Sequence, residues 1–244
     1  MRGVIIIAMA WCYFCVVSKT INMKKLLMLI TGLILCMGVF AQEAKAPVKR
    51  NNYLSLSVGP AFPMGDFASK DIYSNPEAGL AQTGVNVNLQ YAHTWGYFGL
   101  VAQGFYNSHN VQSTTLDGIQ IDMDHWQYYG LMVGPAFIKP LGDKKNLIFD
   151  VKGLIGPVNV NSPKFSVGGQ ALVNEKWNTT IGYGAGMGMK LLFGKSMFAQ
   201  LGLDYLNMNP EFTLEGDVVE EPSNMKYNQP ISTLNLHFGI GINF

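Results

Sequence analysis

The sequence predicts an all-β protein: an eight-stranded antiparallel up-and-down transmembrane β-barrel that follows a cleavable signal peptide. Three observations lead to this prediction. Large apolar residues alternate with small or polar ones along several segments, as in strands whose two faces differ. Charged residues make up only 14% of the chain, whereas aromatic residues make up 12%. Tight turns alternate with long polar loops, which is typical of barrels that cross a membrane.

The chain before residue 42 is predicted to contain a cleavable leader. From Met23 it reads MKKLLMLITGLILCMGVFAQE, with two lysines, an apolar run and small residues at Val39 and Ala41, as in a secretory signal. Cleavage is expected between Ala41 and Gln42. Because this signal is complete, we hypothesise that translation starts at Met23 and that the apolar run upstream is not translated. The expected organisation is an upstream extension at 1–22, a signal peptide at 23–41, a periplasmic N-terminal segment at 42–51 and a barrel at 52–244.

Composition argues against several classes of function. All three cysteines, Cys12, Cys15 and Cys36, precede the expected cleavage site, so neither disulfides nor thiolate catalysis are expected. Removing the leader leaves 13 of the 17 basic residues against 16 acidic ones, a balance that does not suggest a nucleic-acid partner. The four histidines show no short metal-ligand spacing, and no metal or cofactor is expected.

Alternation marks the strands and assigns their faces. In residues 234–244 one face is apolar, whereas the other carries Asn235, His237 and glycines. Residues 179–191 alternate mainly apolar residues with glycines. No segment of the mature chain shows a helical period. Turn signals delimit eight expected strands, at 52–62, 79–93, 97–108, 125–139, 146–161, 178–192, 197–208 and 231–244.

The connections between these strands alternate in length. Three are tight turns, and four are long and polar, near 63–78, 109–124, 162–177 and 209–230. In outer-membrane barrels the short turns lie on the periplasmic side, and both termini are expected there.

A soluble lipocalin-like carrier would also alternate, but its outer face would be rich in Lys and Glu. The less apolar face here carries Gly, Ser, Asn and Gln, which suits a narrow interior.

Adjacent tyrosines at 128 and 129 leave the register of their strand open, or require a bulge. Aromatic residues gather near strand ends, as in interfacial girdles, at Tyr91, Trp95, Tyr97 and Phe98 and again at Trp126, Tyr128 and Tyr129.

The last strand, ending HFGIGINF, resembles the β-signal of outer-membrane proteins. A polar residue is followed two positions later by glycine, and hydrophobic residues occupy the final alternate positions. The resemblance implies that His237, Gly239, Ile242 and Phe244 are read by the barrel assembly machinery. Closure also requires this strand, because an open sheet edge in lipid leaves backbone groups unpaired.

The first strand carries a second resemblance. Residues 52–67, NYLSLSVGPAFPMGDF, are similar to the opening of the small outer-membrane β-barrel domain family of Bacteroidetes type. The resemblance covers 52–244 and implies an OmpA-like eight-stranded barrel in the outer membrane of a Gram-negative cell. It implies no single activity.

Several polar residues are predicted to face the lumen, where an unpaired charge would be costly. We predict Asp–Lys pairs that plug the barrel, because an eight-stranded interior is just wide enough for side chains to fill. A gated narrow channel stays open as an alternative. The predicted lumen network consists of Asp150, Lys152, Lys190, Gln200, Asp204 and His237.

Patterns for catalysis or metal binding are few. The glycines of 182–188 fall at every second residue, not in the spacing of a nucleotide-binding turn. Asp122, Asp124 and His125 are a candidate cation site in a loop. A lipid-modifying enzyme would need catalytic groups at the bilayer rim, where location alone suggests His109, Ser108 and Asp124.

We therefore favour a structural or surface-interaction protein, and not an enzyme. A filled barrel would be anchored in outer-membrane lipid and would present four long loops to the outside. The main alternative is a narrow small-solute channel. A lipid-modifying barrel enzyme and a soluble lipocalin-like carrier are less favoured. The sequence does not identify a loop partner.

Overall fold

The computed structural model describes residues 52–244, apart from 72–73, 112–113, 117–118, 143–145, 164, 168–169, 174–176, 194–195 and 214–225. The expected upstream extension, signal peptide and N-terminal segment, with the cleavage site after Ala41, lie outside the described residues. In the described ranges, no helix is long and apolar enough to cross a membrane.

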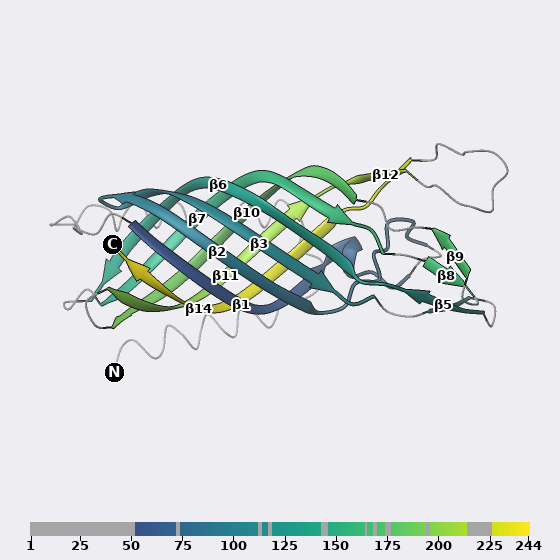
Figure 1. Ribbon diagram of the computed structural model, residues 1–244, viewed down its shortest axis with the longest axis horizontal. Coiled ribbons are helices and arrows are strands. Elements are labelled where there is room, and N and C mark those ends of the chain that lie inside the picture. The colour runs from purple at the N-terminus through teal and green to yellow at the C-terminus, as the bar shows by residue number, and fades with distance from the viewer. Residues whose placement is uncertain are drawn as a thin grey trace. The chain divides into compact units, whose positions relative to one another are not determined.

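Eight antiparallel strands form a closed barrel (Figure 1). Each strand pairs with the next one around the ring, and the first strand pairs with the last. The predicted eight-stranded up-and-down barrel is therefore confirmed, and all expected strand boundaries but one lie within two residues of the observed ones. The barrel strands are β1 (Asn52–Met64), β2 (Gly84–Trp95), β3 (Phe98–His109), β6 (Trp126–Leu141), β7 (Leu147–Asn161), β10 (Trp177–Phe193), β11 (Met197–Met208) and β14 (Ile231–Asn243).

The ladder between β1 and β14 closes the barrel. It runs from the pair Tyr53 and Asn243 to the pair Met64 and Ser232. Beyond it, the Asn52 amide donates to the Phe244 carbonyl at 3.2 Å, and the Phe244 amide donates to the Asn52 carbonyl at 3.0 Å. The final residue is therefore held by the backbone of the first strand.

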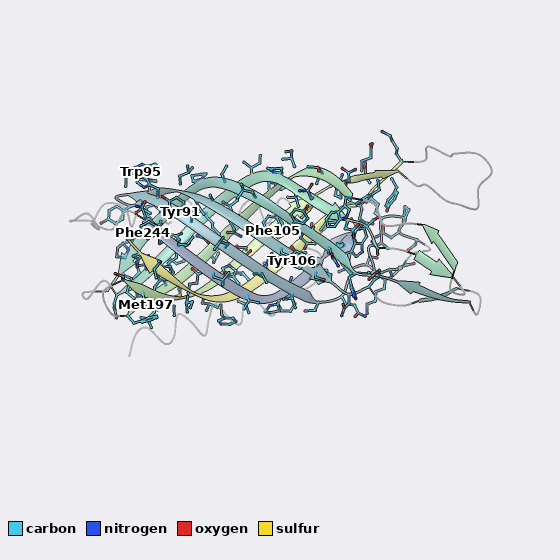
Figure 2. The ribbon with its side chains drawn as sticks, in the orientation of Figure 1. Tyr91, Trp95, Phe105, Tyr106, Met197 and Phe244 are labelled. Carbon is cyan, nitrogen blue, oxygen red and sulfur yellow. The ribbon has the colours of Figure 1, made fainter. Side chains whose placement is uncertain are left out.

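The barrel has an apolar exterior and a polar interior. Along β14 the inward positions carry Thr233, Asn235 and His237, all buried, whereas outward positions carry large apolar residues. Figure 2 shows the outward side chains standing around the barrel wall, with Tyr91, Trp95 and Phe244 together at one end. Trp95 is 56% exposed and Phe244 is 61% exposed. The alternation thus places apolar side chains outside, as predicted.

Only part of the predicted aromatic girdle faces outward. Tyr91, Trp95 and Phe98 are exposed on the outside near the short turn between β2 and β3. Trp126 and Tyr128, in contrast, are 3% and 0% exposed because they point into the lumen.

The register of β6 explains this difference. Its pairing with β7 keeps one register from Gln127 opposite Asn161 to Leu141 opposite Leu147, so no bulge interrupts it. Strict alternation then turns Tyr128 inward and leaves Tyr129 outside.

The long connections are not irregular throughout. Two of them contribute β4 (Thr114–Leu116), β5 (Ile119–Met123), β8 (Phe165–Val167) and β9 (Gln170–Val173), which form one four-stranded sheet. The pairing of β5 with β8 joins two different loops. The last long connection contains the hairpin of β12 (Glu211–Thr213) and β13 (Lys226–Asn228).

The connection between β1 and β2 folds back toward the barrel. It begins with the short 3-10 helix η2 (Gly65–Ala68). The amides of Gly79 and Ala81 then donate to the carbonyls of Asp66 and Phe67, and Leu80 between them has a left-handed φ of 53°. The expected strand 79–93 therefore starts only at Gly84, because the amides of Gly79 and Ala81 pair with η2 and that of Gln82 donates to the Asn110 carbonyl.

Candidate functional site in the barrel lumen

The structure places all six predicted lumen residues inside the barrel, and all are buried. Asp150 and Lys152 lie on β7, Lys190 on β10, and Gln200 and Asp204 on β11. His237 follows on β14. Alternation places each of them on the inward face of its strand.

Lys152 lies at the centre of one ion-pair cluster. Its Nζ is 3.0 Å from Asp204 Oδ2 and also donates to Gln103 Oε1 at 2.7 Å and Gln90 Oε1 at 3.0 Å. Gln103 Nε2 in turn donates to Asp204 Oδ2 at 3.0 Å. The buried ammonium thus has three oxygen partners, one of them a carboxylate, which offsets much of the cost of removing both charges from water.

The pair formed by Lys152 and Asp204 reaches past β10, the strand between β7 and β11. Gly186 of β10 leaves the necessary room. A Cβ at Gly186 would overlap the Asp204 carboxylate and contact the Lys152 side chain. Similarly, a Cβ at Gly202 would overlap the imidazole of His237. These inward glycines therefore provide space for the polar side chains of nearby strands.

Lys190 and Asp150 form a second ion pair, with 2.6 Å between Nζ and Oδ1. The Lys190 ammonium also lies 4.2 Å from the centre of the Tyr53 ring, a cation–π contact. Gln90 joins the two ion pairs, because its Nε2 donates to the Tyr53 hydroxyl at 2.6 Å while its Oε1 accepts from Lys152.

Amide side chains extend the network toward the long loops. Gln103 donates to Asn88 Oδ1 at 3.4 Å, Asn88 to Asn86 at 2.5 Å, and Asn86 to Asn107 at 2.9 Å. These amides and Gln90 were absent from the predicted set. Residues 84–91 also alternate, and their polar face carries Asn86, Asn88 and Gln90, so the sequence contains a signal for these residues.

The other two predicted residues are less connected. His237 Nε2 lies 3.3 Å from Asp204 Oδ2, at the edge of the Lys152 cluster. Gln200 Nε2 has no hydrogen-bond partner in the described part of the chain. Gln200 therefore shares the lumen with the network without joining it through that atom.

A second, largely aromatic cluster fills the lumen near the long loops. Phe67 of η2 is fully buried, with its ring edge-on to those of His109 and Trp126. Trp126 Nε1 donates to the Gly79 carbonyl at 2.9 Å. Gly79 thus holds η2 through its amide and fixes the Trp126 side chain through its carbonyl.

The candidate residues for a lipid-modifying enzyme do not form a catalytic group. His109 is buried, with Nδ1 2.9 Å from the Gln82 carbonyl and Nε2 2.9 Å from the Tyr128 hydroxyl. Ser108 precedes it on β3 and therefore faces the opposite side of the wall. Asp124 is exposed, with Oδ1 3.7 Å from His125 Nε2.

The candidate cation site is only partly visible. Asp124 and His125 contact each other, whereas the side chain of Asp122 lies outside the described residues. Among the residues whose side chains are described, no group of three or more His, Cys, Asp or Glu could hold a metal ion.

The four residues of the β-signal resemblance point in two directions. His237 and Gly239 are on the inward face of β14, whereas Ile242 and Phe244 are outside and exposed. Ile242 also lies opposite Leu54 of β1 in the closing ladder.

Several solved structures are similar to this chain at low sequence identity. No protein-family model matches the sequence, and no curated protein matches it. Neisserial surface protein A is 10% identical, with a TM-score of 0.49, and the match covers 79% of this chain and 97% of that one. The attachment invasion locus protein Ail of Yersinia pestis is 16% identical, with a TM-score of 0.46 and coverage of 81% and 100%. OprG of Pseudomonas aeruginosa is 13% identical, with a TM-score of 0.45 and coverage of 80% and 97%.

Proposed function

We propose that this protein is an outer-membrane barrel with a closed lumen, acting as a structural or surface-interaction protein through its long loops. The observation that carries the proposal is the inverted distribution of side chains. Apolar residues cover the outside of a closed sheet, while the ion pairs and amides lie inside it.

The exterior supports residence in lipid. Outward residues of β14 include Phe238, Ile240 and Ile242, each about half exposed or more. In water such a continuous apolar surface would promote association, because soluble proteins rarely expose large apolar patches. In a bilayer it matches the hydrocarbon, and the closed ladder leaves no unpaired sheet edge. A lipocalin-like carrier would require the opposite distribution.

The filled lumen argues against a channel. In the lumen Lys152 pairs with Asp204 and donates to Gln90 and Gln103. The ion pair of Lys190 and Asp150 lies there as well, and Phe67 fills the lumen nearer the long loops. Solute passage would require these buried ion pairs to separate, at the cost of exposing their charges. A structural role or a role in surface contacts needs no such opening.

Charge distribution supports contacts through the long loops. The four connections at 65–83, 110–125, 162–176 and 209–230 contain 12 acidic and 4 basic residues. The short turns at 96–97, 142–146 and 194–196 contain 1 acidic and 3 basic residues. The loop end should therefore attract cationic partners and repel polyanions. One loop cation is already paired, because Lys226 Nζ donates to Glu211 Oε1 at 2.7 Å, and this hydrogen bond raises the pKa of Lys226.

Membrane residence is tested by fractionation and by electrophoresis of boiled and unboiled samples. A closed barrel in the outer-membrane fraction should migrate differently before and after boiling. Deletion of Phe244 should reduce the folded form, because it removes the backbone pair with Asn52 and the last residue of the proposed assembly signal. A soluble periplasmic protein with no mobility shift would contradict the proposal and favour a lipocalin-like carrier.

Closure of the lumen is tested separately in planar lipid bilayers. The folded barrel should give no unitary conductance. Reproducible single-channel steps from heat-modifiable protein would contradict the closed-lumen part of the proposal and favour a narrow channel.

For the enzymatic alternative, an unchanged lipid A profile on deletion and re-expression would agree with a non-enzymatic role.

A further inference from the structure

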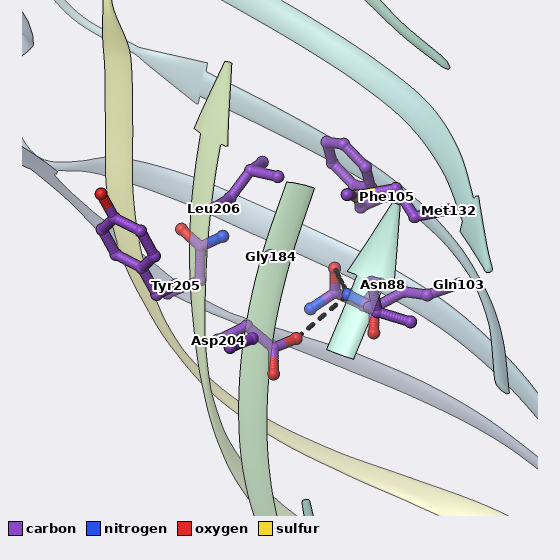
Figure 3. A pocket seen from close by; sticks show the side chains of 11 residues that line it. Asn88, Gln103, Phe105, Met132, Gly184, Asp204, Tyr205 and Leu206 are labelled. Carbon is purple, nitrogen blue, oxygen red and sulfur yellow. Dashed lines mark hydrogen bonds between the residues drawn. The ribbon is translucent and has the colours of Figure 1, made fainter. Parts of the chain in front are cut away.

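A small cavity lies in the lumen beside the Lys152 cluster. Its volume is about 20 Å³. Figure 3 shows Asp204 and Gln103 on its polar side and Phe105, Met132 and Leu206 on its apolar side. Asn235 also lines it.

Two residues that line the cavity each carry an oxygen atom without a donor. Asp204 of β11 and Asn235 of β14 are directly opposite each other in the ladder, so their side chains share the inward face. Both residues are buried, with 6% and 3% exposure. Asp204 Oδ1 and Asn235 Oδ1 are both without a hydrogen-bond partner among the described residues.

The amide donors of Gln103 and Asn88, which line the cavity, are engaged elsewhere, and His237 Nε2 lies 3.3 Å from Asp204 Oδ2 but does not line the cavity. Gln103 Nε2 donates to Asp204 Oδ2, the other carboxylate oxygen, and Asn88 Nδ2 donates to Asn86. Two buried acceptors at opposing positions are unfavourable unless a donor lies between them, because each has lost its hydrogen bonds to water. The missing component is therefore a small species with two donor hydrogens.

We propose that one water molecule occupies this cavity and donates a hydrogen bond to Asp204 Oδ1 and another to Asn235 Oδ1. A single buried water needs a cavity of roughly 10–15 Å³, so this volume suits one water molecule. Buried waters usually form hydrogen bonds to two or more polar groups. The rest of the wall is mostly apolar, and its other polar side chains, Asn88 and Gln103, already form hydrogen bonds within the lumen network.

A metal cation fits the cavity less well than water. Lys152 already compensates the charge of Asp204 at 3.0 Å, so an added cation would leave a net positive charge in the lumen. A hard cation would also require about six oxygen ligands, more than the two unpartnered oxygens supply.

The decisive experiment is a crystal structure of the folded barrel from crystals grown in RbCl, at a resolution that shows ordered waters. We expect one density peak within hydrogen-bond distance of both Oδ1 atoms and no anomalous signal from rubidium at that position. An anomalous peak would identify a cation and overturn the proposal. An empty cavity, with the Asn235 amide turned to donate directly to Asp204, would overturn it as well.

Solution NMR provides a second test with matched variants. Magnetisation transfer from a long-lived water to backbone amides near Asp204 should disappear in Asn235→Leu, which removes one acceptor and fills space. It should persist in Asn107→Leu, the same change at a lumen residue that does not line the cavity. Persistence in Asn235→Leu, or loss in both folded variants, would contradict the assignment. If Asn235→Leu does not fold, the wild-type crystal structure still decides.

Discussion

Replacement of Lys152 by Met should strongly destabilise the barrel. The change keeps most of the side-chain volume but removes the ammonium that contacts Asp204, Gln90 and Gln103. Asp204 then remains as a buried carboxylate with no compensating lysine.

The expected loss can be worked out from burial. The two side chains of the pair are 3% and 8% exposed, so solvent screening offers little relief. Removing one partner of such a pair typically costs about 3–5 kcal/mol, because the other charge is left uncompensated. The double variant Lys152→Met with Asp204→Asn removes both charges and should recover most of this loss.

Urea unfolding from lipid vesicles, followed by the fraction of heat-modifiable protein, measures the free energy of unfolding of each variant. Together with the single Asp204→Asn variant, these values complete a double-mutant cycle that gives the coupling between the two side chains. Lys226→Met is the control, because its pair with Glu211 is 62% and 53% exposed, and we expect no measurable shift in the unfolding midpoint. If Lys152→Met shifted the midpoint no more than this control, or if the double variant were no more stable than Lys152→Met, the reasoning would be refuted.

Three further predictions concern other features. Gly186→Ala should lower stability because its Cβ would overlap Asp204, whereas Gly153→Ala, whose Cβ meets open space on the outer wall, should change it little; the same urea titration compares them. Phe67→Ala should lower the free energy of unfolding by about 3–5 kcal/mol, the usual range for an emptied buried aromatic site. The outward Phe62→Ala is its control, and equal losses of stability would show that Phe67 does not fill the lumen near the long loops. Whole cells displaying the protein should retain cationic beads more than anionic ones, with the difference fading as salt is raised; stronger retention of anionic beads would contradict the role of the acidic loops.

The barrel could be predicted from the sequence because its strands alternate strictly on a two-residue period. The one large boundary error, at the start of β2, has a physical cause. Residues 79–83 continue the strand pattern, but Leu80 adopts a left-handed φ and its neighbours bond to η2. Nothing local marks a leucine for that conformation, which is uncommon for residues with a Cβ.

The lumen residues could be assigned to a face, but their partners could not be predicted. Lys190 and Asp150 lie on adjacent strands, whereas Lys152 reaches Asp204 past an intervening strand through the space left by Gly186. Which aspartate each lysine contacts depends on the register of three strands at once. The burial of Phe67 could not be predicted either, because it requires the connection between β1 and β2 to fold back toward the barrel.

The ladder between β1 and β14 has a consequence for the timing of folding. Its partners are the first and last residues of the barrel, so the pairing with the greatest separation along the chain is also the one that removes the final open edges. Contacts between such distant residues form slowly, because the loop entropy must be lost before the contact stabilises anything. Every newly made copy should therefore pass through an interval in which its strands have paired into sheet segments but the barrel has not yet closed. During this interval the chain depends on being kept apart from other copies of itself.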